Sequence, residues 1–173
     1  MSGRSRLGAS LVAVVFAIAV LAGCGLSAEE KVKVQEAQLK ELIAQADAWG
    51  AEVIAQVPAS EVELLSDNVG GARGVSDYNQ QWPRYYYFAQ TVVLRADGPR
   101  TPTQMADDIE PWLEDQGWER NKGSEFPPDD DRFERDYYRD GYHLVVEVYT
   151  EPPPRAQSIN FTIVTPQTDP DRR

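Results

Sequence analysis

The chain has 173 residues, and 28 aspartates and glutamates against 17 lysines and arginines give a formal net charge of −11 at pH 7. An acidic surface repels the phosphate backbone, so this balance excludes nucleic-acid binding as a general activity. One cysteine and one histidine exclude a disulfide framework and a zinc site. The sequence therefore predicts no cofactor, no metal and no nucleic-acid partner.

The N-terminal stretch has the pattern of a secretory signal peptide. Arg4 and Arg6 are the only charged residues before an apolar run over 11–22. This run is shorter than the roughly 20 apolar residues that a membrane-spanning helix needs. A basic start, a short apolar run and small residues before a cleavage point are instead typical of export signals. We therefore expect residues 1–23 to be removed after export.

The apolar run ends in Leu21-Ala22-Gly23-Cys24, which resembles a bacterial lipobox. The resemblance implies that the Cys24 thiol receives a diacylglyceryl group, that the signal is cut before it, and that the new N-terminus is often acylated, typically with palmitate. The mature protein would then be lipid-anchored at the extracytoplasmic face of the cell membrane, because two or more acyl chains anchor stably where one is marginal. The alternative is an ordinary secretory signal with an incidental cysteine.

The mature chain of 150 residues is long enough for one domain with a sizeable core. Residues 24–173 hold all 28 acidic residues and 15 of the 17 basic ones, so their net charge is −13. Such a charge also repels anionic membrane surfaces, which suits a body held off the bilayer. We expect a lipid anchor and long helix over 24–65, an α+β domain over 66–165 and a polar tail over 166–173.

A long helix is predicted over 28–57. Ser27 is a good N-cap, and Pro58 ends the pattern. We interpret the first half as a partly solvated stalk and the second half as docked on the domain, because the apolar positions become denser there. A coiled-coil dimer through the same stripe is the alternative. The stripe contains Val32, Leu39, Leu42, Ala46, Trp49 and Val53, widened by Ile43, Ile54 and Val57.

The middle of the chain reads as a loop, a strand and a second helix. Residues 66–84 are rich in glycine and polar residues, which predicts a long loop. Residues 85–95 carry aromatic and β-branched side chains, which predict a strand. Thr101 is placed to cap the second helix, and Gly117 is placed to end it. Pro111 inside this helix should kink it or leave a carbonyl unbonded.

The clearest local pattern is a β-hairpin around Asp140-Gly141. This dipeptide favours a two-residue type I′ turn, so 132–139 and 142–150 should pair with facing residue numbers that sum to 281. A final strand is predicted over 158–164. The order predicts an α+β fold: an antiparallel sheet of about four strands with a helix packed on one face, preceded by the long N-terminal helix. That long helix either joins the second helix, which leaves the other face open, or covers the other face.

The residues that could do chemistry form no catalytic or metal-binding pattern. His143 has no serine in a nucleophile elbow, so a half-exposed strand histidine is the simpler interpretation. The run Asp129–Asp131 lacks the glycine and glutamate of a calcium loop, which favours a solvated acidic loop. Glu134 should face Glu147, a pair capable of acid–base work, but nearby arginines favour a surface salt-bridge ladder. We therefore expect a protein that is not an enzyme.

The predicted strands gather aromatic side chains on one face of the sheet. Tyrosine gives rigid amphipathic contact area at low entropic cost, so this face is the candidate recognition surface. The alternative is that the first helix covers this face, with Trp49 packed on the tyrosines. The long loop with Trp82 is a second candidate. The candidate surface comprises Tyr85, Tyr87, Tyr138, His143 and Tyr149.

The layout after the lipobox resembles small actinobacterial lipoproteins of the mycobacterial LppA type, with Gly117 and the Asp140-Gly141-Tyr142 turn as shared features. The paired cysteines of that family are absent here, and the resemblance implies no function. Our leading hypothesis is a non-catalytic binding or accessory protein of the cell envelope, with a protein or cell-wall partner. A lipid- or solute-binding module would need an apolar cavity between helix and sheet. A hydrolase acting through His143 or the glutamate pair is the third hypothesis.

Overall fold

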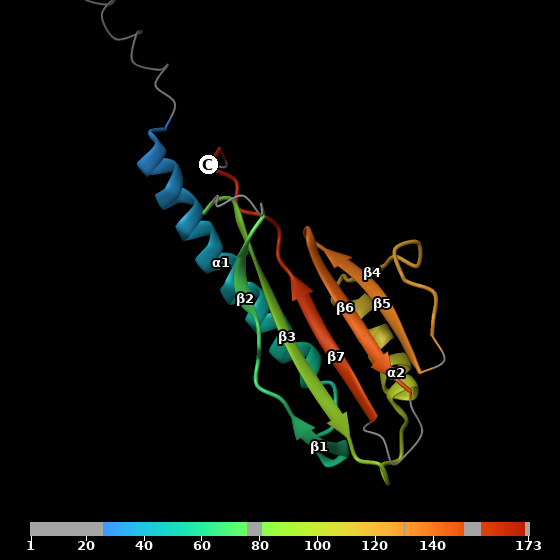
Figure 1. Cartoon of the computed structure of the whole chain (residues 1–173). Helices are drawn as coiled ribbons and strands as arrows, with labels where there is room; N and C mark the ends of the chain where they lie inside the picture. Colours follow the sequence, from blue (N-terminus) through green and yellow to red (C-terminus); the bar gives the residue numbers. More distant parts are fainter. Residues whose placement is uncertain (1–25, 76–80, 130, 151–156, 172–173) are drawn as a thin grey trace, which may run out of the picture.

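A computed structural model describes residues 26–75, 81–129, 131–150 and 157–171 (Figure 1). The signal peptide and Cys24 lie outside these residues, so the lipid anchor stays a prediction. No helix within the described ranges is long and apolar enough to span a membrane. The elements are α1 (Ala28–Ile54), η1 (Ala59–Glu61), β1 (Val62–Leu65), β2 (Gly71–Gly74), β3 (Arg84–Leu94), α2 (Pro102–Asp115), β4 (Glu119–Arg120), β5 (Arg132–Arg139), β6 (Tyr142–Tyr149) and β7 (Gln157–Val164).

The strands of the described chain form one seven-stranded antiparallel sheet. Its order is β1-β3-β7-β6-β5-β4, and β2 also pairs with β3. The four strands expected from the sequence correspond to the four long ones, β3, β5, β6 and β7. The expected number of about four was nevertheless too low, because β1, β2 and the two-residue β4 extend the sheet at its edges.

β1 and β2 exist because both pair with the same outer edge of the long strand β3. The stretch between them is irregular, and side chains replace the missing ladder bonds. Asn68 Oδ1 accepts hydrogen bonds from the N–H groups of Gly70 (2.8 Å) and Ala89 (3.1 Å). Ser66 Oγ accepts one from the N–H of Thr91 at 2.9 Å. Polar and glycine residues that predict a loop can thus run along a sheet edge.

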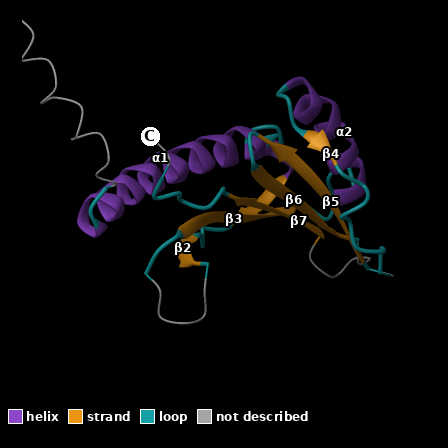
Figure 2. Ribbon diagram, turned by 90° about the horizontal axis from the view of Figure 1, so that it is seen from above, coloured by secondary structure: helices purple, strands orange, loops and turns teal. Residues whose placement is uncertain are grey.

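Both helices pack on the same face of the sheet, as Figure 2 shows. α1 crosses β3 and β7, and α2 contacts β6, β7 and β4. The expectation of a single helix on one face is therefore corrected to two helices on that face. Strand alternation explains this arrangement, because only one face is apolar. On β7, for example, Phe161 points to the helices, whereas its neighbour Thr162 points to the other face.

The first half of α1 is docked along one side, and its other side is exposed. The chain after β7 returns along it, and Thr168 Oγ1 donates a hydrogen bond to Gln35 Oε1 at 3.0 Å. Lys31 forms an ion pair with Asp171 at 2.9 Å. Gln35 and Leu39 are buried. This half is therefore partly solvated, as predicted, but it is not a free stalk, because the last described residues pack along one side of it.

α1 packs closely against the sheet at Gly50. A Cβ atom there would lie 2.5 Å from the Phe88 ring, so a larger residue would force the helix away. The neighbouring Trp49 packs edge-to-face against Trp118, with 5.3 Å between centroids, and against Tyr142, at 4.8 Å. These contacts tie α1 to the segment after α2 and to the β5–β6 hairpin.

The local predictions for α2 agree with the structure. Thr101 Oγ1 accepts the N–H of Gln104 at 3.2 Å, and the Gln104 side chain accepts the N–H of Thr101 at 2.9 Å, which completes the capping box. The helix continues through Pro111 to Asp115. Since Pro111 has no N–H, it donates no bond within the helix. Gly117 has the predicted positive φ, at 85°.

The β5–β6 hairpin has the predicted register. Phe133 lies opposite Val148, and Tyr138 lies opposite His143. The turn residue Gly141 has a φ of 81°, and the preceding Asp140 has a φ of 50°, as a type I′ turn requires. Because the register is set here, the face to which each β5 and β6 side chain points is also set.

Candidate functional site

The candidate site is the face of the sheet that no helix covers. Trp49 lies on the opposite face, so the alternative in which α1 covers the tyrosines is wrong. Of the predicted residues, Tyr138 is 37% exposed, and Tyr85, Tyr87, His143 and Tyr149 are half-buried. We call this surface the open face. It consists of Tyr85, Tyr87, Ala89, Thr91, Val93, Arg132, Glu134, Asp136, Tyr138, His143, Val145, Glu147, Tyr149, Ser158, Asn160, Thr162 and Val164.

Three predicted aromatic residues lie in one row across the open face. Tyr87 is opposite Val164 on β7, Val164 is opposite His143 on β6, and His143 is opposite Tyr138 on β5. The rings of Tyr138 and His143 are stacked, with 4.5 Å between centroids and 1° between planes. The row therefore presents flat aromatic surface from β3 and from the β5–β6 hairpin, which are far apart in the chain.

Asp136 fixes the orientation of the His143 ring. The His143 Nε2 atom lies 2.9 Å from Asp136 Oδ1. The Asp136 side chain is only 5% exposed, whereas that of His143 is 31% exposed. With Nε2 engaged, only Nδ1 of His143 is left for a ligand. Among the described residues no hydroxyl is hydrogen-bonded to His143, so a Ser–His–Asp arrangement is not assembled there.

Polar side chains cross the middle of the open face. Thr91 Oγ1 donates to Asn160 Oδ1 at 3.1 Å, and Asn160 Nδ2 lies 3.5 Å from Glu147 Oε2. Arg132 Nη1 donates to Glu147 Oε1 at 3.0 Å. Glu134 faces Glu147 in the register, as expected. Arg132 pairs with Glu147 as predicted, but Arg135 points to the covered face, so the arrangement is an ion pair rather than the predicted ladder.

Tyr149 lies at the other end of the open face. It lies six positions after His143 on β6, which is about 20 Å at the rise of an antiparallel strand. Burial, and then the negative charge of Glu147, raise the pKa of the Tyr149 hydroxyl, so this group remains a hydrogen-bond donor at neutral pH. The five predicted residues thus share one face, but only three of them share a row.

Arg73 of β2 borders the row and was not singled out from the sequence. Its guanidinium lies 5.5 Å from the centroid of the Tyr87 ring, and Nη2 donates to the Tyr87 hydroxyl at 3.1 Å. Tyr85 lies directly opposite Arg73 in the sheet. The glycines on both sides of Arg73 made this stretch resemble a loop. The only sequence feature that could have indicated a role for Arg73 was its position as a basic residue shortly before a run of tyrosines.

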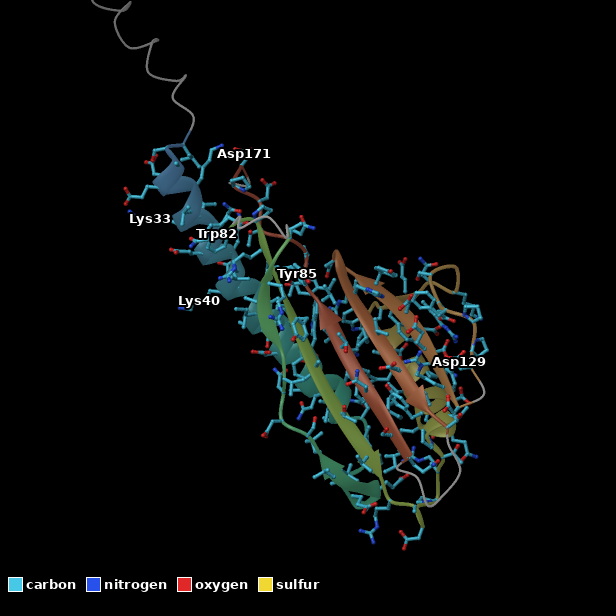
Figure 3. The ribbon with its side chains drawn as sticks, in the orientation of Figure 1. Lys33, Lys40, Trp82, Tyr85, Asp129 and Asp171 are labelled. Atoms are coloured by element: carbon cyan, nitrogen blue, oxygen red, sulfur yellow. The ribbon has the colours of Figure 1, made fainter. Side chains whose placement is uncertain are left out.

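Trp82, the second predicted candidate, does not belong to the open face. Its side chain packs against the hydrophobic core, and the Arg84 guanidinium lies 5.8 Å from its ring. Figure 3 shows Trp82 and Tyr85 at one side of the molecule and Asp129 at the other. Residues 76–80 of the predicted loop lie outside the described residues. Trp82 therefore contributes to stability rather than to the aromatic row.

The open face combines aromatic rings with carboxylates and amides, which suit binding. Within 26–75, 81–129, 131–150 and 157–171, no three histidine, cysteine, aspartate or glutamate side chains are grouped to hold a metal ion. Asp129 of the predicted acidic loop pairs with Arg132 at 3.6 Å, and Asp130 is not described. A comparison of the chain with models of known protein families, with curated proteins and with solved structures finds no match.

Proposed function

We propose that the chain is an extracytoplasmic lipoprotein, anchored to the cell membrane through Cys24, that binds an envelope protein through the open face. The observation that carries this proposal is the row of Tyr87, His143 and Tyr138 on a sheet face free of helices. Tyrosines are enriched at protein interfaces, where they bury rigid area and keep a polar tip. The proposed function is recognition and not catalysis.

The acidity of the chain favours a basic partner. On the open face, Glu134 and Glu147 are half-buried carboxylates, whereas Asp136 is buried beside His143. Glu147 is paired with Arg132. The mature chain has a net charge of −13, which accelerates association with a cationic protein. A neutral cell-wall glycan, the other partner class, would gain nothing from this charge.

The packing of the interior supports recognition over internal ligand binding. Between α1 and β3, the Phe88 ring fills the space beside Gly50. Val53 of α1 and Val92 of β3 are fully buried at the same interface. A lipid- or solute-binding module would need room between these elements.

Photocrosslinking in intact cells tests the proposal. A photoreactive amino acid in place of Thr162, at the centre of the open face, should give a discrete product with the full-length lipoprotein. The same amino acid in place of the exposed Glu114 on α2 is the matched control and should not. The double variant Tyr87→Ser, Tyr138→Ser should lower the yield about fivefold or more. An equal yield from both positions, or an unchanged yield in the double variant, would contradict the proposal.

The anchor needs a separate test. Cys24→Ala removes the thiol that would carry the lipid, so the variant should move from the membrane fraction to the released fraction. The control is Ser27→Ala, which lies nearby and leaves the thiol intact. If the Cys24→Ala protein stayed in the membrane fraction after cleavage of its signal, lipidation would be refuted.

A further inference from the structure

The aromatic row of the open face ends in a ring that is covered on one side only. Tyr138 is stacked on His143, which lies opposite it on β6. The two ring planes are nearly parallel, at 1°, so the other side of the Tyr138 ring faces away from β6 and toward β4. The residue opposite Tyr138 on β4 is Glu119, and paired residues of a sheet point to the same face. Glu119 therefore stands next to the uncovered side of the ring.

The side chain of Glu119 is exposed, and it forms no hydrogen bond or ion pair with any described residue. Its carboxylate thus stands beside the face of the Tyr138 ring, and the face of an aromatic ring carries the negative part of its quadrupole. Two negative groups do not stabilise each other, whereas a cation between them is attracted to both. The end of the aromatic row is therefore a position that a positively charged group would complete.

An open depression of about 450 Å³ provides space for such a group. It is lined by Tyr138 and Glu119, by Gln116 and Gly117 before β4, and by the turn of the β5–β6 hairpin. The depression therefore lies at the edge of the open face, where the end of a long side chain from another protein has access to both the ring and the carboxylate.

One cation of the chain itself borders this depression, but it is already engaged. Arg139 follows Tyr138 on β5, so its side chain points to the covered face, where the guanidinium lies 4.4 Å from the centroid of the Trp49 ring. Its Nε atom pairs with Asp140 at 3.6 Å. Arg139 and Asp140 thus compensate each other's charge, and the carboxylate of Glu119 is the lining charge without a partner among the described residues.

We infer that an arginine of the partner protein occupies this depression, with its guanidinium stacked on the free side of Tyr138 and paired with Glu119. An arginine fits better than a lysine, because a planar guanidinium stacks on an aromatic ring while its N–H groups bond a carboxylate. It would extend the stack of Tyr138 and His143 by one more planar group. The inference rests on the proposed function for the source of the arginine, which is the protein that binds the open face.

The first test measures the binding of a single arginine. It uses the full-length protein in a non-ionic detergent, with a photoreactive amino acid in place of Gln116, which lines the depression. The probe is a labelled peptide with one arginine between glycines and with blocked ends. One twin carries citrulline, which has the shape of arginine without its charge, and another carries lysine. The arginine peptide should give about fivefold more product than the citrulline peptide and about twofold more than the lysine peptide. Equal yields from arginine and citrulline, or a higher yield from lysine, would overturn the inference.

Variants of the ring and of the carboxylate separate the depression from general acidity. Glu119→Gln removes the charge and Tyr138→Leu removes the ring, and each should lower the yield of the arginine peptide about threefold. Glu114→Gln is the matched control, because Glu114 is exposed on α2 and does not line the depression. It should leave the yield unchanged. If Glu114→Gln lowered the yield as much as Glu119→Gln, the net charge of the chain would attract the peptide, and the inference would be overturned.

The second test uses the partner itself and separates this inference from the proposed function. In photocrosslinking from position 162 in intact cells, Glu119→Gln should lower the yield of the partner product about threefold, whereas Glu114→Gln should not. An unchanged yield in Glu119→Gln, together with a lower yield in the double variant Tyr87→Ser, Tyr138→Ser, would overturn the arginine contact and leave the proposed function in place. If position 162 gave no product even in the wild type, the proposed function would fail, and the partner's arginine with it.

Discussion

The same strands form both faces of the sheet. Successive residues point to opposite faces, so the two faces carry different kinds of side chain. On β7, Ile159, Phe161 and Ile163 point to the helices and are fully buried. Asn160 and Thr162, between them, point to the open face and are half-buried. The residues that stabilise the core and those of the proposed recognition surface are therefore direct neighbours in the chain. Substitutions at neighbouring positions should therefore change different measurements.

The helix-covered face is not uniformly apolar, because charged side chains form ion pairs at its outer part. Arg135 points to this face with a side chain 9% exposed, and its Nη1 donates to Glu110 of α2 at 2.8 Å. Its Nη2 pairs with Asp107 on the same helix. Arg120 of β4 also donates to Glu110, at 3.0 Å. α2 is thus held to β5 by an ion-pair network as well as by apolar packing.

The largest effect should come from a substitution on the covered face of β7. Phe161→Ala removes a fully buried ring, and the expected loss is about 3–5 kcal/mol of unfolding free energy. Thr162→Ala, one residue away on the open face, should lose less than about 1 kcal/mol. Urea unfolding of both variants would measure the difference. Similar losses for the two would show that the open face also belongs to the core.

The next effect should come from the ion-pair network. Glu110→Ala leaves the nearly buried Arg135 with one carboxylate partner and removes a partner from Arg120. We expect a loss of about 2 kcal/mol, below the 3–5 kcal/mol of a fully buried pair because the Glu110 side chain is 22% exposed. Glu114→Ala, on the exposed side of α2, is the control in urea unfolding. If both variants lost the same stability, the network would contribute nothing beyond helix propensity.

Features set by neighbouring residues were predictable, and features set by distant partners were not. Asp140-Gly141 determines the β5–β6 register because a two-residue turn leaves one way to pair. Thr101 and Gly117 bound α2 through their own backbone geometry. β1 and β2, by contrast, depend on the outer edge of β3 and on bonds from Asn68. Nothing in their local pattern identifies that edge.

The candidate site shows the same limit. The stacking of Tyr138 on His143 follows from the hairpin register, which the sequence supplied. The place of Tyr87 in the same row depends on β7 lying between β3 and β6, and chain order does not reveal this. The sequence could have shown that no helix covers this face. A helix there would have buried the carboxylates of Glu134 and Glu147 at a high cost in free energy.

The buried Tyr137 sharpens the comparison, because its hydroxyl makes the stability of the covered face depend on pH. Burial, and then the charge of Glu110, raise the pKa of Tyr137 to about 12 from its ordinary value of 10.0. The folded protein therefore holds this proton more tightly than the unfolded chain does. Its contribution to stability is complete below pH 10 and is lost as the pH rises toward 12, with about 1 kcal/mol gone at pH 11.

The variant Tyr137→Phe tests this dependence, because it removes the ionisable hydroxyl from the covered face. Its unfolding free energy should fall less between pH 9 and pH 11 than that of the wild type, by about 1 kcal/mol. Tyr138→Phe removes the neighbouring hydroxyl from the open face and retains Tyr137, so it should keep the wild-type fall. If the unfolding free energy of Tyr137→Phe fell by as much as that of the wild type, groups other than Tyr137 would cause the dependence on pH.

The smallest effect on stability should come from the open face itself. Tyr138→Ser removes a ring that is 37% exposed and stacked on His143, and the expected loss is about 0.5 kcal/mol. The same variant removes one end of the aromatic row on which the proposed interface rests, so its loss of crosslinked partner should be large. Urea unfolding measures the first quantity, and crosslinking from position 162 measures the second. A side chain that contributes little to folding and much to binding is the expected property of a recognition surface, since its ring completes its packing only against the partner. If Tyr138→Ser instead destabilised the protein by several kcal/mol, the stack with His143 would be a structural support for the edge of the sheet, and the recognition surface would have to be sought elsewhere.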